Sequence, residues 1–348
     1  MKMKKFLAGI TALVLSFSAF TGCGSTSQGD GAGEVSNDGS EVTKVIIGTQ
    51  EMPNDEGISK ALDYFKDEMG VDVELKKFDS GKDVNTAIAS GSIDFGLMGT
   101  CPASLAIAQD LGVEFIWIHE VLGSVESLVA RNETGITAVA DLKGKKVAVP
   151  FASTAHFSLL KAIEDAGMTA EDVEILDLAT DKIYASWENG DIDAAYIWQP
   201  TLAELKDQTV ILTSEDMADK GYMTANVEVV RKEFADANPE IVAGYIRALD
   251  KAVKLYNSDK SAAVSAISSS MQLEESDAEF QMAGSKWLTA EEQTGADYLG
   301  TSEAKGAVVK NLMDTAEFLK SQGSIQEVPA REIFEAAVNP SYIEAALK

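Results

Sequence analysis

The chain has 348 residues, of which 45% are hydrophobic, and it carries a formal net charge of −27 with only two His and two Cys. An acidic surface of this kind repels nucleic acid and anionic lipid, so it excludes nucleic acid as a partner. The chain is long enough for one large hydrophobic core or two smaller ones.

The N-terminal residues have the pattern of an export signal. Three lysines precede an apolar run at residues 6–20, and about fifteen apolar residues are too few to span a bilayer, which needs roughly twenty. Gly22-Cys23 resembles the bacterial lipoprotein cleavage site, where the cysteine becomes the first residue and is lipidated, for example with palmitate. We therefore expect a signal peptide at residues 1–22 and a protein anchored to the extracytoplasmic face of the membrane through Cys23. An ordinary secreted protein, in which Cys23 is incidental, is the alternative.

Residues 23–42 are expected to form a flexible tether between this anchor and a folded body. They are mostly Gly, Ser, Thr, Asn, Asp and Gln, a composition that cannot build a core and whose coil reaches on the order of 20–25 Å. If Cys23 is lipidated, Cys101 is the only cysteine left, and no intrachain disulfide can form.

The first part of the body alternates strands with helices. Strands are expected at 43–48, 71–78, 95–98, 114–118, 127–130, 146–149, 173–178, 194–198 and 227–231. Helices are expected between them at 57–69, 84–90, 155–166 and 183–189. This rhythm predicts parallel sheets covered by helices on both faces. After Asn238 the expected elements form a helical C-terminal tail, at 239–256, 262–269, 276–286, 304–321, 331–337 and 342–348.

A weak internal repeat suggests two similar lobes. Gly91-Ser92-Ile93-Asp94 leads through a short strand to Pro102, and Gly190-Asp191-Ile192-Asp193 leads through another to Pro200. Both copies have the order helix, Gly-x-Ile-Asp turn, strand and Pro-containing helix. Because ligands of parallel sheets bind beyond the carboxyl ends of the strands, two facing lobes predict one cleft between them. Asp94 and Asp193 begin their strands, so we expect them to hold turns at the far edge.

Several motifs closely resemble the substrate-binding proteins of taurine ABC importers. The resemblance rests on Lys77–Gly81 (KFDSG), Ala87–Ile93 (AIASGSI), Gly99–Pro102, Val149–Leu160 (VPFASTAHFSLL), Gly190–Trp198 (GDIDAAYIW) and Trp287–Gln293 (WLTAEEQ). It covers the body from about residue 45 to the C-terminus. Together the motifs are fairly specific for the taurine and aliphatic-sulfonate group.

The resemblance implies an α/β, two-lobed type II periplasmic-binding-protein fold with the ligand cleft between the lobes. On that pattern, residues 43–127 and 232–348 form the first lobe and residues 128–231 the second. The family implies a monomer that captures taurine or a related small sulfonate, closes around it like a hinge and delivers it to an ABC permease. The energy for transport would come from the partner ATPase, since this chain has no Gly-x-x-x-x-Gly-Lys-Ser/Thr phosphate loop. We expect no cofactor.

The first candidate ligand site is an anion site at the start of a helix. Ser153 or Thr154 can cap the helix that follows the strand at 146–149, and its free N–H groups and dipole suit a sulfonate. The same residues could serve only as a cap. His156, in the first turn, could donate to a ligand oxygen or satisfy a backbone carbonyl. Metal binding is not expected, because His119 and His156 lack a ligand spacing.

Other candidates follow the strand ends. Gln50 and Thr100 carry donors suited to a sulfonate, and Ser80 caps a helix or contacts ligand. Trp198 could cover the methylenes of the ligand or belong to the core. Cys101 is expected to be a small packed residue near the site.

The ammonium group of taurine needs a carboxylate, and Glu120 stands at a strand end where a cleft residue should be. Pairing with His119 or exposure to solvent are the alternatives for Glu120. Members of the family often carry an Asp at the position of Asn226, and this asparagine can accept a hydrogen bond but offers no charge. Glu228, two residues later, could compensate.

Two alternatives to the sulfonate-binding function stay open. The ligand could be another small anion, such as nitrate or bicarbonate, or a pyrimidine precursor. The fold also occurs in desulfinase-type enzymes, and Cys101 with His119 or His156 could form a thiolate pair. We expect a binding protein and not an enzyme, because no arginine stands in any of the cleft-end motifs.

Overall fold

The computed structural model describes residues 42–50 and 52–348. The expected signal peptide, the lipidated Cys23 and the tether up to residue 41 lie outside the described residues. No helix in the described part of the chain is long and apolar enough to cross a membrane.

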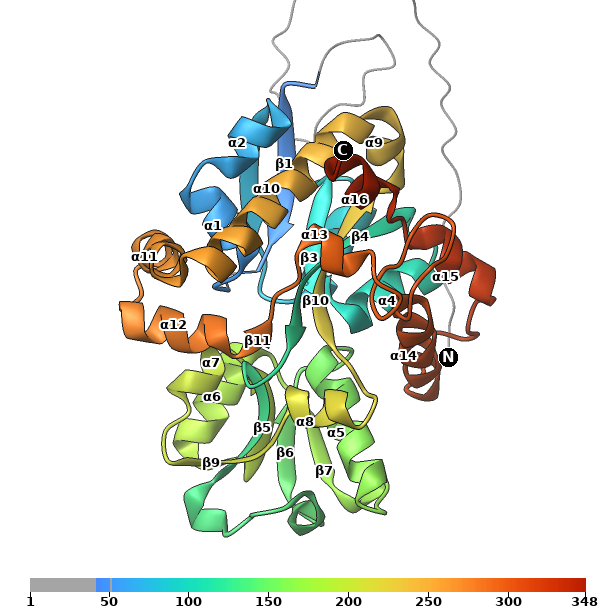
Figure 1. Cartoon of the computed structure of the whole chain (residues 1–348). Helices are drawn as coiled ribbons and strands as arrows, with labels where there is room; N and C mark the ends of the chain where they lie inside the picture. Colours follow the sequence, from blue (N-terminus) through green and yellow to red (C-terminus); the bar gives the residue numbers. More distant parts are fainter. Residues whose placement is uncertain (1–41, 51) are drawn as a thin grey trace, which may run out of the picture. The chain divides into compact units, whose positions relative to one another are not determined.

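The described strands form two separate mixed sheets, which are drawn one above the other in Figure 1. The six-stranded sheet, with its helices, is called lobe 1; its strands are β1 (Lys44–Thr49), β2 (Asp72–Lys77), β3 (Phe95–Gly99), β4 (Val113–Leu122), β10 (Ala225–Arg231) and β11 (Ser285–Lys286). The five-stranded sheet, with its helices, is called lobe 2; its strands are β5 (Glu126–Arg131), β6 (Lys146–Val149), β7 (Glu174–Asp177), β8 (Ala194–Trp198) and β9 (Gln208–Thr213).

The helices divide between the lobes in the same way. Lobe 1 contains α1 (Asp55–Ala61), α2 (Tyr64–Met69), α3 (Gly81–Ala89), α4 (Thr100–Ala108), α9 (Lys232–Ala237), α10 (Pro239–Ser258), α11 (Lys260–Met271), α12 (Glu275–Ala283), α13 (Ala290–Gln293), α14 (Val308–Ser321), α15 (Arg331–Ala337) and α16 (Ser341–Ala346). Lobe 2 contains α5 (Thr154–Asp165), α6 (Thr180–Asn189), α7 (Thr201–Glu204) and α8 (Ser214–Asp219). The short 3₁₀ turns are Asn132–Thr134, Val139–Leu142 and Ala170–Asp172.

Each sheet has a parallel part and an antiparallel part. The strand order is β11-β4-β10-β3-β1-β2 in lobe 1 and β7-β6-β8-β5-β9 in lobe 2. β1 pairs in parallel with β2 and β3, and β6 with β7 and β8, whereas β10 and β5 run antiparallel to both neighbours. The expectation of wholly parallel sheets is therefore wrong for β10 and β5, because each follows a crossing between the lobes that reverses the chain direction.

Both faces of the lobe 2 sheet are buried. Tyr196 on β8 belongs to one apolar cluster, while its neighbours Ala195 and Ile197 belong to another on the opposite face. Alternation of this kind is expected for a strand that has helices on both sides. Lobe 1 has one larger core around Phe95, Trp117 and the helices of the C-terminal tail.

The chain crosses between the lobes at residues 123–125 and 220–224, and a hydrogen bond of 2.9 Å from Leu122 N to Thr224 O joins the two crossings. The second crossing comes earlier than expected, because β10 belongs to lobe 1 although the expected second lobe ran to residue 231. Gly123 lies in the first crossing, where an added Cβ would come within 2.5 Å of the carbonyl oxygen of Gly284. A side chain at position 123 would push β11 away from the crossing.

Two expected helices differ from the structure. The single helix expected at 57–69 is two helices, because Asp63 adopts the left-handed conformation with φ of 57° between α1 and α2. The helix expected at 276–286 ends at Ala283, and Ser285–Lys286 pairs with β4 instead. β9 and α8 were not expected at all.

The internal repeat is confirmed at its two aspartates. Asp94 Oδ2 accepts a hydrogen bond of 2.9 Å from Ile46 N, and Asp193 Oδ2 accepts one of 2.8 Å from Lys146 N. Each aspartate therefore ties the start of its own strand to a neighbouring strand in the same lobe. This edge lies away from the strand ends that form the cleft, as expected.

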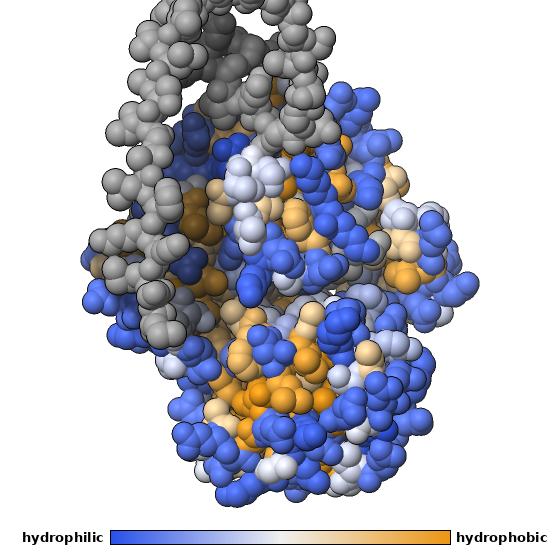
Figure 2. Space-filling view, turned by 180° about the vertical axis from the view of Figure 1, so that it is seen from behind, coloured by the Kyte–Doolittle hydropathy of each residue, from blue (hydrophilic) through white to orange (hydrophobic). Residues whose placement is uncertain are grey.

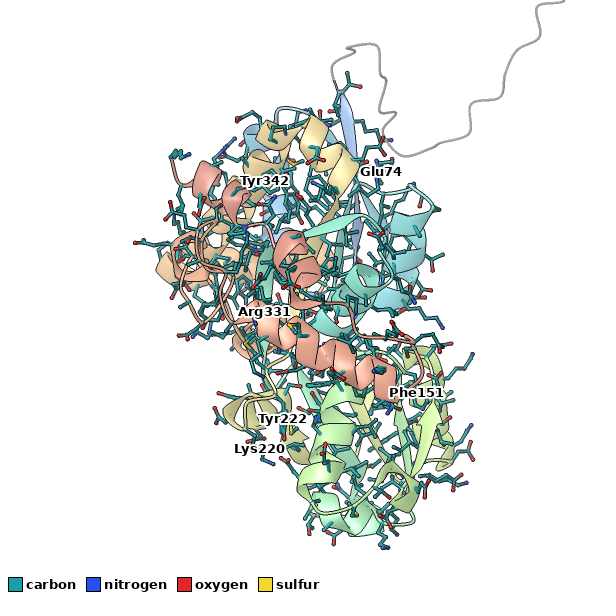
Figure 3. The ribbon with its side chains drawn as sticks, turned by 90° about the vertical axis from the view of Figure 1, so that its right-hand side faces the viewer. Glu74, Phe151, Lys220, Tyr222, Arg331 and Tyr342 are labelled. Atoms are coloured by element: carbon teal, nitrogen blue, oxygen red, sulfur yellow. The ribbon has the colours of Figure 1, made fainter. Side chains whose placement is uncertain are left out.

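The helix α14 contacts both lobes. It packs against α4 of lobe 1, and Asn311 Nδ2 donates a 2.7 Å hydrogen bond to Met223 O in the second crossing. On lobe 2, the ring of Phe318 meets those of His156 and Phe157 edge-on, each with centroids 5.3 Å apart. Figure 3 shows the helix running down to the level of Phe151.

Candidate binding cleft

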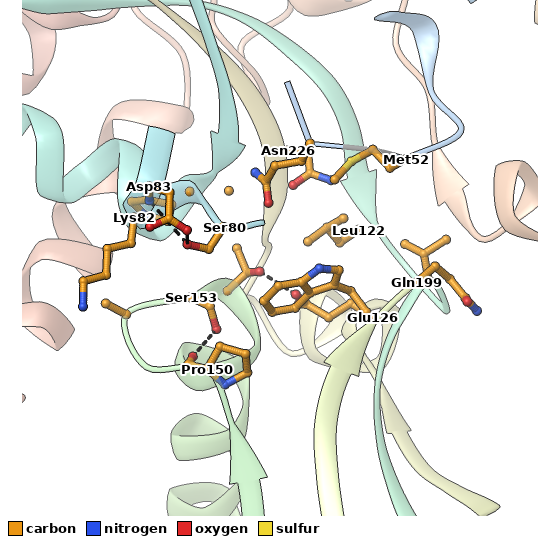
Figure 4. A pocket seen from close by; sticks show the side chains of 18 of the residues that line it. Met52, Ser80, Lys82, Asp83, Leu122, Glu126, Pro150, Ser153, Gln199 and Asn226 are labelled. Atoms are coloured by element: carbon orange, nitrogen blue, oxygen red, sulfur yellow. Dashed lines mark hydrogen bonds between the residues drawn. The ribbon is translucent and has the colours of Figure 1, made fainter. Parts of the chain in front are cut away.

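A cleft of about 520 Å³ lies between the two lobes, and both contribute to its lining. In Figure 4, Asn226 and Met52 lie along one wall, Ser153 and Pro150 lie on the opposite wall, and Leu122 and Glu126 lie between them. On the face shown in Figure 2, hydrophilic residues predominate and apolar residues gather on lobe 2.

The cleft forms where the carboxyl ends of strands from both sheets meet. Gln50 follows β1, Gly99 ends β3, Asp177 ends β7 and Trp198 ends β8, and all four line the cleft. The N-terminal ends of α3, α4 and α5 contribute lining residues as well. Because each helix begins with unpaired N–H groups and a positive dipole end, these ends favour negative charge in the cleft.

The α5 N-terminus has the expected cap. Ser153 Oγ accepts a 3.1 Å hydrogen bond from His156 N and donates one of 2.6 Å to Pro150 O. The hydroxyl proton of Thr154 is also committed, since it is donated to Glu126 Oε2. The donors left for a ligand are therefore the first N–H groups of the helix and not the two hydroxyls, although Ser153 and Thr154 were both candidate ligand residues.

His156 does not line the cleft but stacks beneath a residue that does. Its ring lies parallel to that of Phe151 with centroids 4.2 Å apart, and its Nδ1 accepts a hydrogen bond from Ala152 N. Burial lowers the pKa of His156 to about 4, so the ring is neutral at physiological pH. His156 supports the loop at residues 150–152, and it brings no positive charge to a bound anion.

Glu126 is a buried carboxylate in the lining that was not expected from the sequence. It is 1% exposed, and it accepts hydrogen bonds from Thr154 Oγ1 and, at 2.8 Å, from Ser214 Oγ. Burial raises its pKa to about 7. A Glu directly after the first crossing is the signal that could have identified it.

Glu120 and Asn226 lie opposite each other on β4 and β10 and form a hydrogen-bonded pair. Asn226 Nδ2 donates to Glu120 Oε1 at 2.6 Å, while Glu120 Oε2 is buried without a partner. Burial raises the pKa of Glu120 to about 7. The alternative in which Glu120 pairs with His119 is wrong, because Glu120 pairs with Asn226 and both ring nitrogens of His119 contact other acids.

The expected compensation by Glu228 is also wrong. Glu228 is fully buried within lobe 1, where Oε2 lies 2.9 Å from His119 Nε2 and accepts a 2.7 Å hydrogen bond from Tyr245. His119 Nδ1 contacts Asp55 Oδ1 at 2.7 Å. The carboxylates of Asp55 and Glu228 raise the pKa of His119 well above its usual value, against the effect of burial. Glu228 therefore has no part in the lining.

The other expected site residues divide into two groups. Gln50, Ser80 and Trp198 line the cleft; Gln50 Nε2 donates to Leu97 O, and Ser80 caps α3. Thr100 and Cys101 are buried in the first turn of α4 and lie outside the lining. Burial raises the pKa of the Cys101 thiol well above its usual value.

Several other lining residues were missed, and some of them are polar or aromatic side chains from distant parts of the chain. Asp177, Gln199 and Trp287 line the cleft together with Lys82. Lys82 is the only basic residue among the described lining residues, which also include Asp83, Asp177, Glu120 and Glu126. The described lining is therefore acidic overall, and an anionic ligand must rely on backbone donors.

Comparison with known proteins places the chain in a family. A family model described as NMT1/THI5 like matches residues 58–263. The taurine-binding periplasmic protein of Escherichia coli (strain K12) is 35% identical over 295 residues, which are 83% of this chain and 89% of that protein.

Two solved structures show the same fold. The alkanesulfonate-binding protein SsuA from Xanthomonas axonopodis pv. citri, bound to MOPS, has a TM-score of 0.68 at 21% identity, over 86% of this chain and 99% of that one. The desulfurization enzyme DSZB has a TM-score of 0.60 at 16% identity, over 88% of this chain and 99% of that one. The chain therefore belongs to the NMT1/THI5-like family, together with the taurine-binding periplasmic protein, and has a two-lobed periplasmic-binding-protein fold.

Proposed function

We propose that this protein is an extracytoplasmic solute-binding protein that captures taurine or a related small sulfonate and delivers it to an ABC permease. The observation that carries the proposal is the cleft between the lobes, into which the N-terminal ends of three helices open. The likeness to the taurine-binding periplasmic protein over most of both chains supports the ligand class.

The sulfonate would bind at the start of α5. A sulfonate has three acceptor oxygens and stays ionised at physiological pH, so backbone N–H groups and a helix dipole suffice to hold it. The cap at Ser153 fixes the direction of these N–H groups, and Phe151, stacked on His156, forms the edge of the site. Trp198 supplies an aromatic face for the short carbon chain of the ligand.

Ligand capture would proceed by rotation of the lobes about the two crossings. A ligand that contacts both walls favours the closed form, and closure excludes water from the charged groups. The closed form would then dock on the permease, whose ATPase supplies the energy. We propose that the protein acts as a monomer, since one chain provides both walls of the cleft.

The location would be the extracytoplasmic face of the membrane. The periplasmic relative supports export of the body. The proposal of a lipid anchor at Cys23, preceded by a signal peptide at residues 1–22 and followed by a tether, rests on the sequence pattern alone.

An enzyme of the desulfinase type is the second candidate, because DSZB has the same fold. A thiolate mechanism needs an accessible cysteine with a lowered pKa. Cys101 is fully buried with a raised pKa, and both ring nitrogens of His119 are engaged by Asp55 and Glu228. We therefore propose a binding protein without catalytic activity.

Calorimetric titration of the purified protein with taurine, ethanesulfonate, nitrate and bicarbonate tests the proposed function. We expect measurable affinity for at least one sulfonate and none for the other two anions. If only nitrate or bicarbonate bound, the ligand would be that anion and the proposed sulfonate ligand would be wrong. The Cys101→Ser variant separates the two classes of protein, because a binding protein keeps its affinity and an enzyme loses its turnover.

A further inference from the structure

Pro150, Phe151 and Ala152 form the loop that leads into α5, and all three line the cleft. Proline has no N–H group, and side chains accept from the other two. Phe151 N donates a 2.9 Å hydrogen bond to Asp177 Oδ1, and Ala152 N donates one of 3.3 Å to His156 Nδ1. The loop therefore has no backbone donor left for a ligand, and the donors of the site have to come after it in the chain.

The next three residues supply these donors. Among the described residues, no hydrogen-bond acceptor is found for the N–H groups of Ser153, Thr154 and Ala155. The N–H group that follows them, that of His156, is already bound by the cap of α5. Three free N–H groups match the three oxygens of a sulfonate. Their directions depend on how the chain enters the helix, and this entry is set at Ala152.

Ala152 has the left-handed backbone conformation, with φ of 58°. A residue with a Cβ adopts this conformation at a steric cost, and it persists only where the surrounding structure holds it. Alanine has no polar side chain that could bond to the nearby backbone, as Asn or Asp can. The hydrogen bond from Ala152 N to His156 is therefore the contact that holds this turn.

The ring of His156 is held in one orientation from two sides, and its side chain is 2% exposed. It is parallel to the ring of Phe151 within 3°, with centroids 4.2 Å apart, and Phe318 of α14 meets it at 74°. Nδ1 can accept from Ala152 N only while it has no proton of its own. The hydrogen bond thus requires a neutral imidazole whose proton is on Nε2.

The surroundings of His156 favour this neutral form. Burial lowers its pKa to about 4, and Asp177 on β7, the charged group that acts on the ring, opposes burial only in part. The two rings in contact with it, those of Phe151 and Phe318, carry no charge. A bound sulfonate therefore meets no cation at His156, and the histidine can act on the ligand only through the loop.

We propose that His156 is a positioning residue of the sulfonate site, which holds Ala152 in its left-handed turn and so directs the first N–H groups of α5 into the cleft. The proposal rests on the proposed sulfonate-binding function and adds to it a residue that does not touch the ligand. Because taurine and ethanesulfonate share the sulfonate group, loss of this positioning weakens the binding of both by the same factor.

The ring of His156 and its acceptor can be removed separately. His156→Phe keeps a ring that can stack on Phe151 but leaves Ala152 N without an acceptor. His156→Asn removes the ring but attaches an amide oxygen to Cγ, where Nδ1 is attached in the histidine. Calorimetry of the full protein at pH 7 should show taurine and ethanesulfonate bound about tenfold more weakly by His156→Phe, the order expected when a donor loses its partner. His156→Asn should weaken both by less than about threefold, since the acceptor is kept.

Ala152→Gly supplies a rescue, because glycine adopts a positive φ without a steric cost. In the His156→Phe background it should recover part of the affinity for both sulfonates, and thermal unfolding of each variant shows that the fold is retained. Unchanged affinity in His156→Phe would overturn the proposal. A loss in His156→Asn as large as that in His156→Phe, or no recovery with Ala152→Gly, would overturn it as well.

Nitrogen NMR of the imidazole rings tests the neutral form directly. The chain has only two histidines, so untagged protein labelled at histidine gives signals from two rings. At pH 7 we expect both nitrogens protonated in His119, whose pKa is raised, and only Nε2 protonated in His156, with or without taurine. A doubly protonated His156 in the complex would overturn the proposal. Failure of the unmodified protein to bind either sulfonate would overturn the proposed function and this proposal with it, whereas the other contrary results overturn only the role of His156.

Discussion

The Nε2 atom of His119 lies 2.9 Å from Oε2 of Glu228, and both side chains are entirely buried in lobe 1. The other ring nitrogen of His119 contacts Asp55. The imidazole thus bridges two buried acids that lie far apart in the sequence. Removing this imidazole would leave both buried acids without a positively charged partner.

The first prediction concerns this bridge. His119→Ala should destabilise the protein by about 3–5 kcal/mol, because breaking a buried ion pair leaves uncompensated charge. Urea unfolding followed by circular dichroism measures the change. Combining it with Asp55→Asn and Glu228→Gln should restore part of the stability, and a triple variant no more stable than His119→Ala would contradict the explanation.

The second prediction is that stability falls as the pH rises from about 5 to 8. The folded-state pKa of Glu126 is raised by burial to about 7 and that of Glu56 to about 8, and the pKa of His119 is raised as well. Groups with raised pKa values stabilise the fold while they are protonated and lose this contribution as the pH passes through the folded pKa. For Glu126 alone the loss is on the order of 3 kcal/mol between its unfolded and folded pKa values.

Thermal unfolding between pH 4.5 and 8.5 measures this dependence. The melting temperature should be highest near pH 5, and Glu126→Gln should reduce the slope between pH 5 and 8. A melting temperature that rises steadily towards pH 8 would show that these carboxyls are ionised in the folded protein at much lower pH.

The third prediction concerns the contact of the lobes at Gly99. A Cβ added there would lie 2.8 Å from Thr154 Cγ2, which is across the cleft in lobe 2. Gly99→Ala should therefore hold the lobes apart and weaken the binding of every ligand, with little effect on the fold of either lobe. Small-angle scattering with and without ligand measures the change, and unaltered scattering and affinity in Gly99→Ala would contradict the prediction.

The fourth prediction separates the two ends of the ligand. Ser153→Ala removes the cap of α5 and should cost about 1 kcal/mol of stability. Because it disturbs the site for the sulfonate and not that for the ammonium, it should weaken taurine and ethanesulfonate binding by the same factor. A selective loss of taurine would place the sulfonate elsewhere.

The fifth prediction concerns the N-terminus. If Cys23 is the lipidated residue, Cys23→Ala should abolish incorporation of a labelled fatty acid and release the protein from the membrane fraction. Cys101→Ala is the matched control and should leave both unchanged. Label that persists in Cys23→Ala would show that the anchor is attached elsewhere.

The sequence predicts the order of the elements and the strand ends at the cleft, because periodicity and the repeated Gly-x-Ile-Asp turns are local signals. The same alternation indicates that His119 and Glu120, as neighbours on a strand, have different surroundings. The partners of these residues are not local. Asp55 is 64 residues from His119, and Thr154 is 28 residues from Glu126. The hydrogen bond from Thr154 to Glu126 can therefore be recognised only in the folded structure.

Phe318 on α14 touches His156 and Phe157 of lobe 2 although its own helix packs on lobe 1. Opening the cleft has to separate these rings and expose their apolar surface to water. The ring contacts thus favour the closed form of the ligand-free protein. Less of the intrinsic binding free energy is then needed to close the lobes. Residue 318 can consequently influence the apparent dissociation constant, although it is not among the residues that line the cleft.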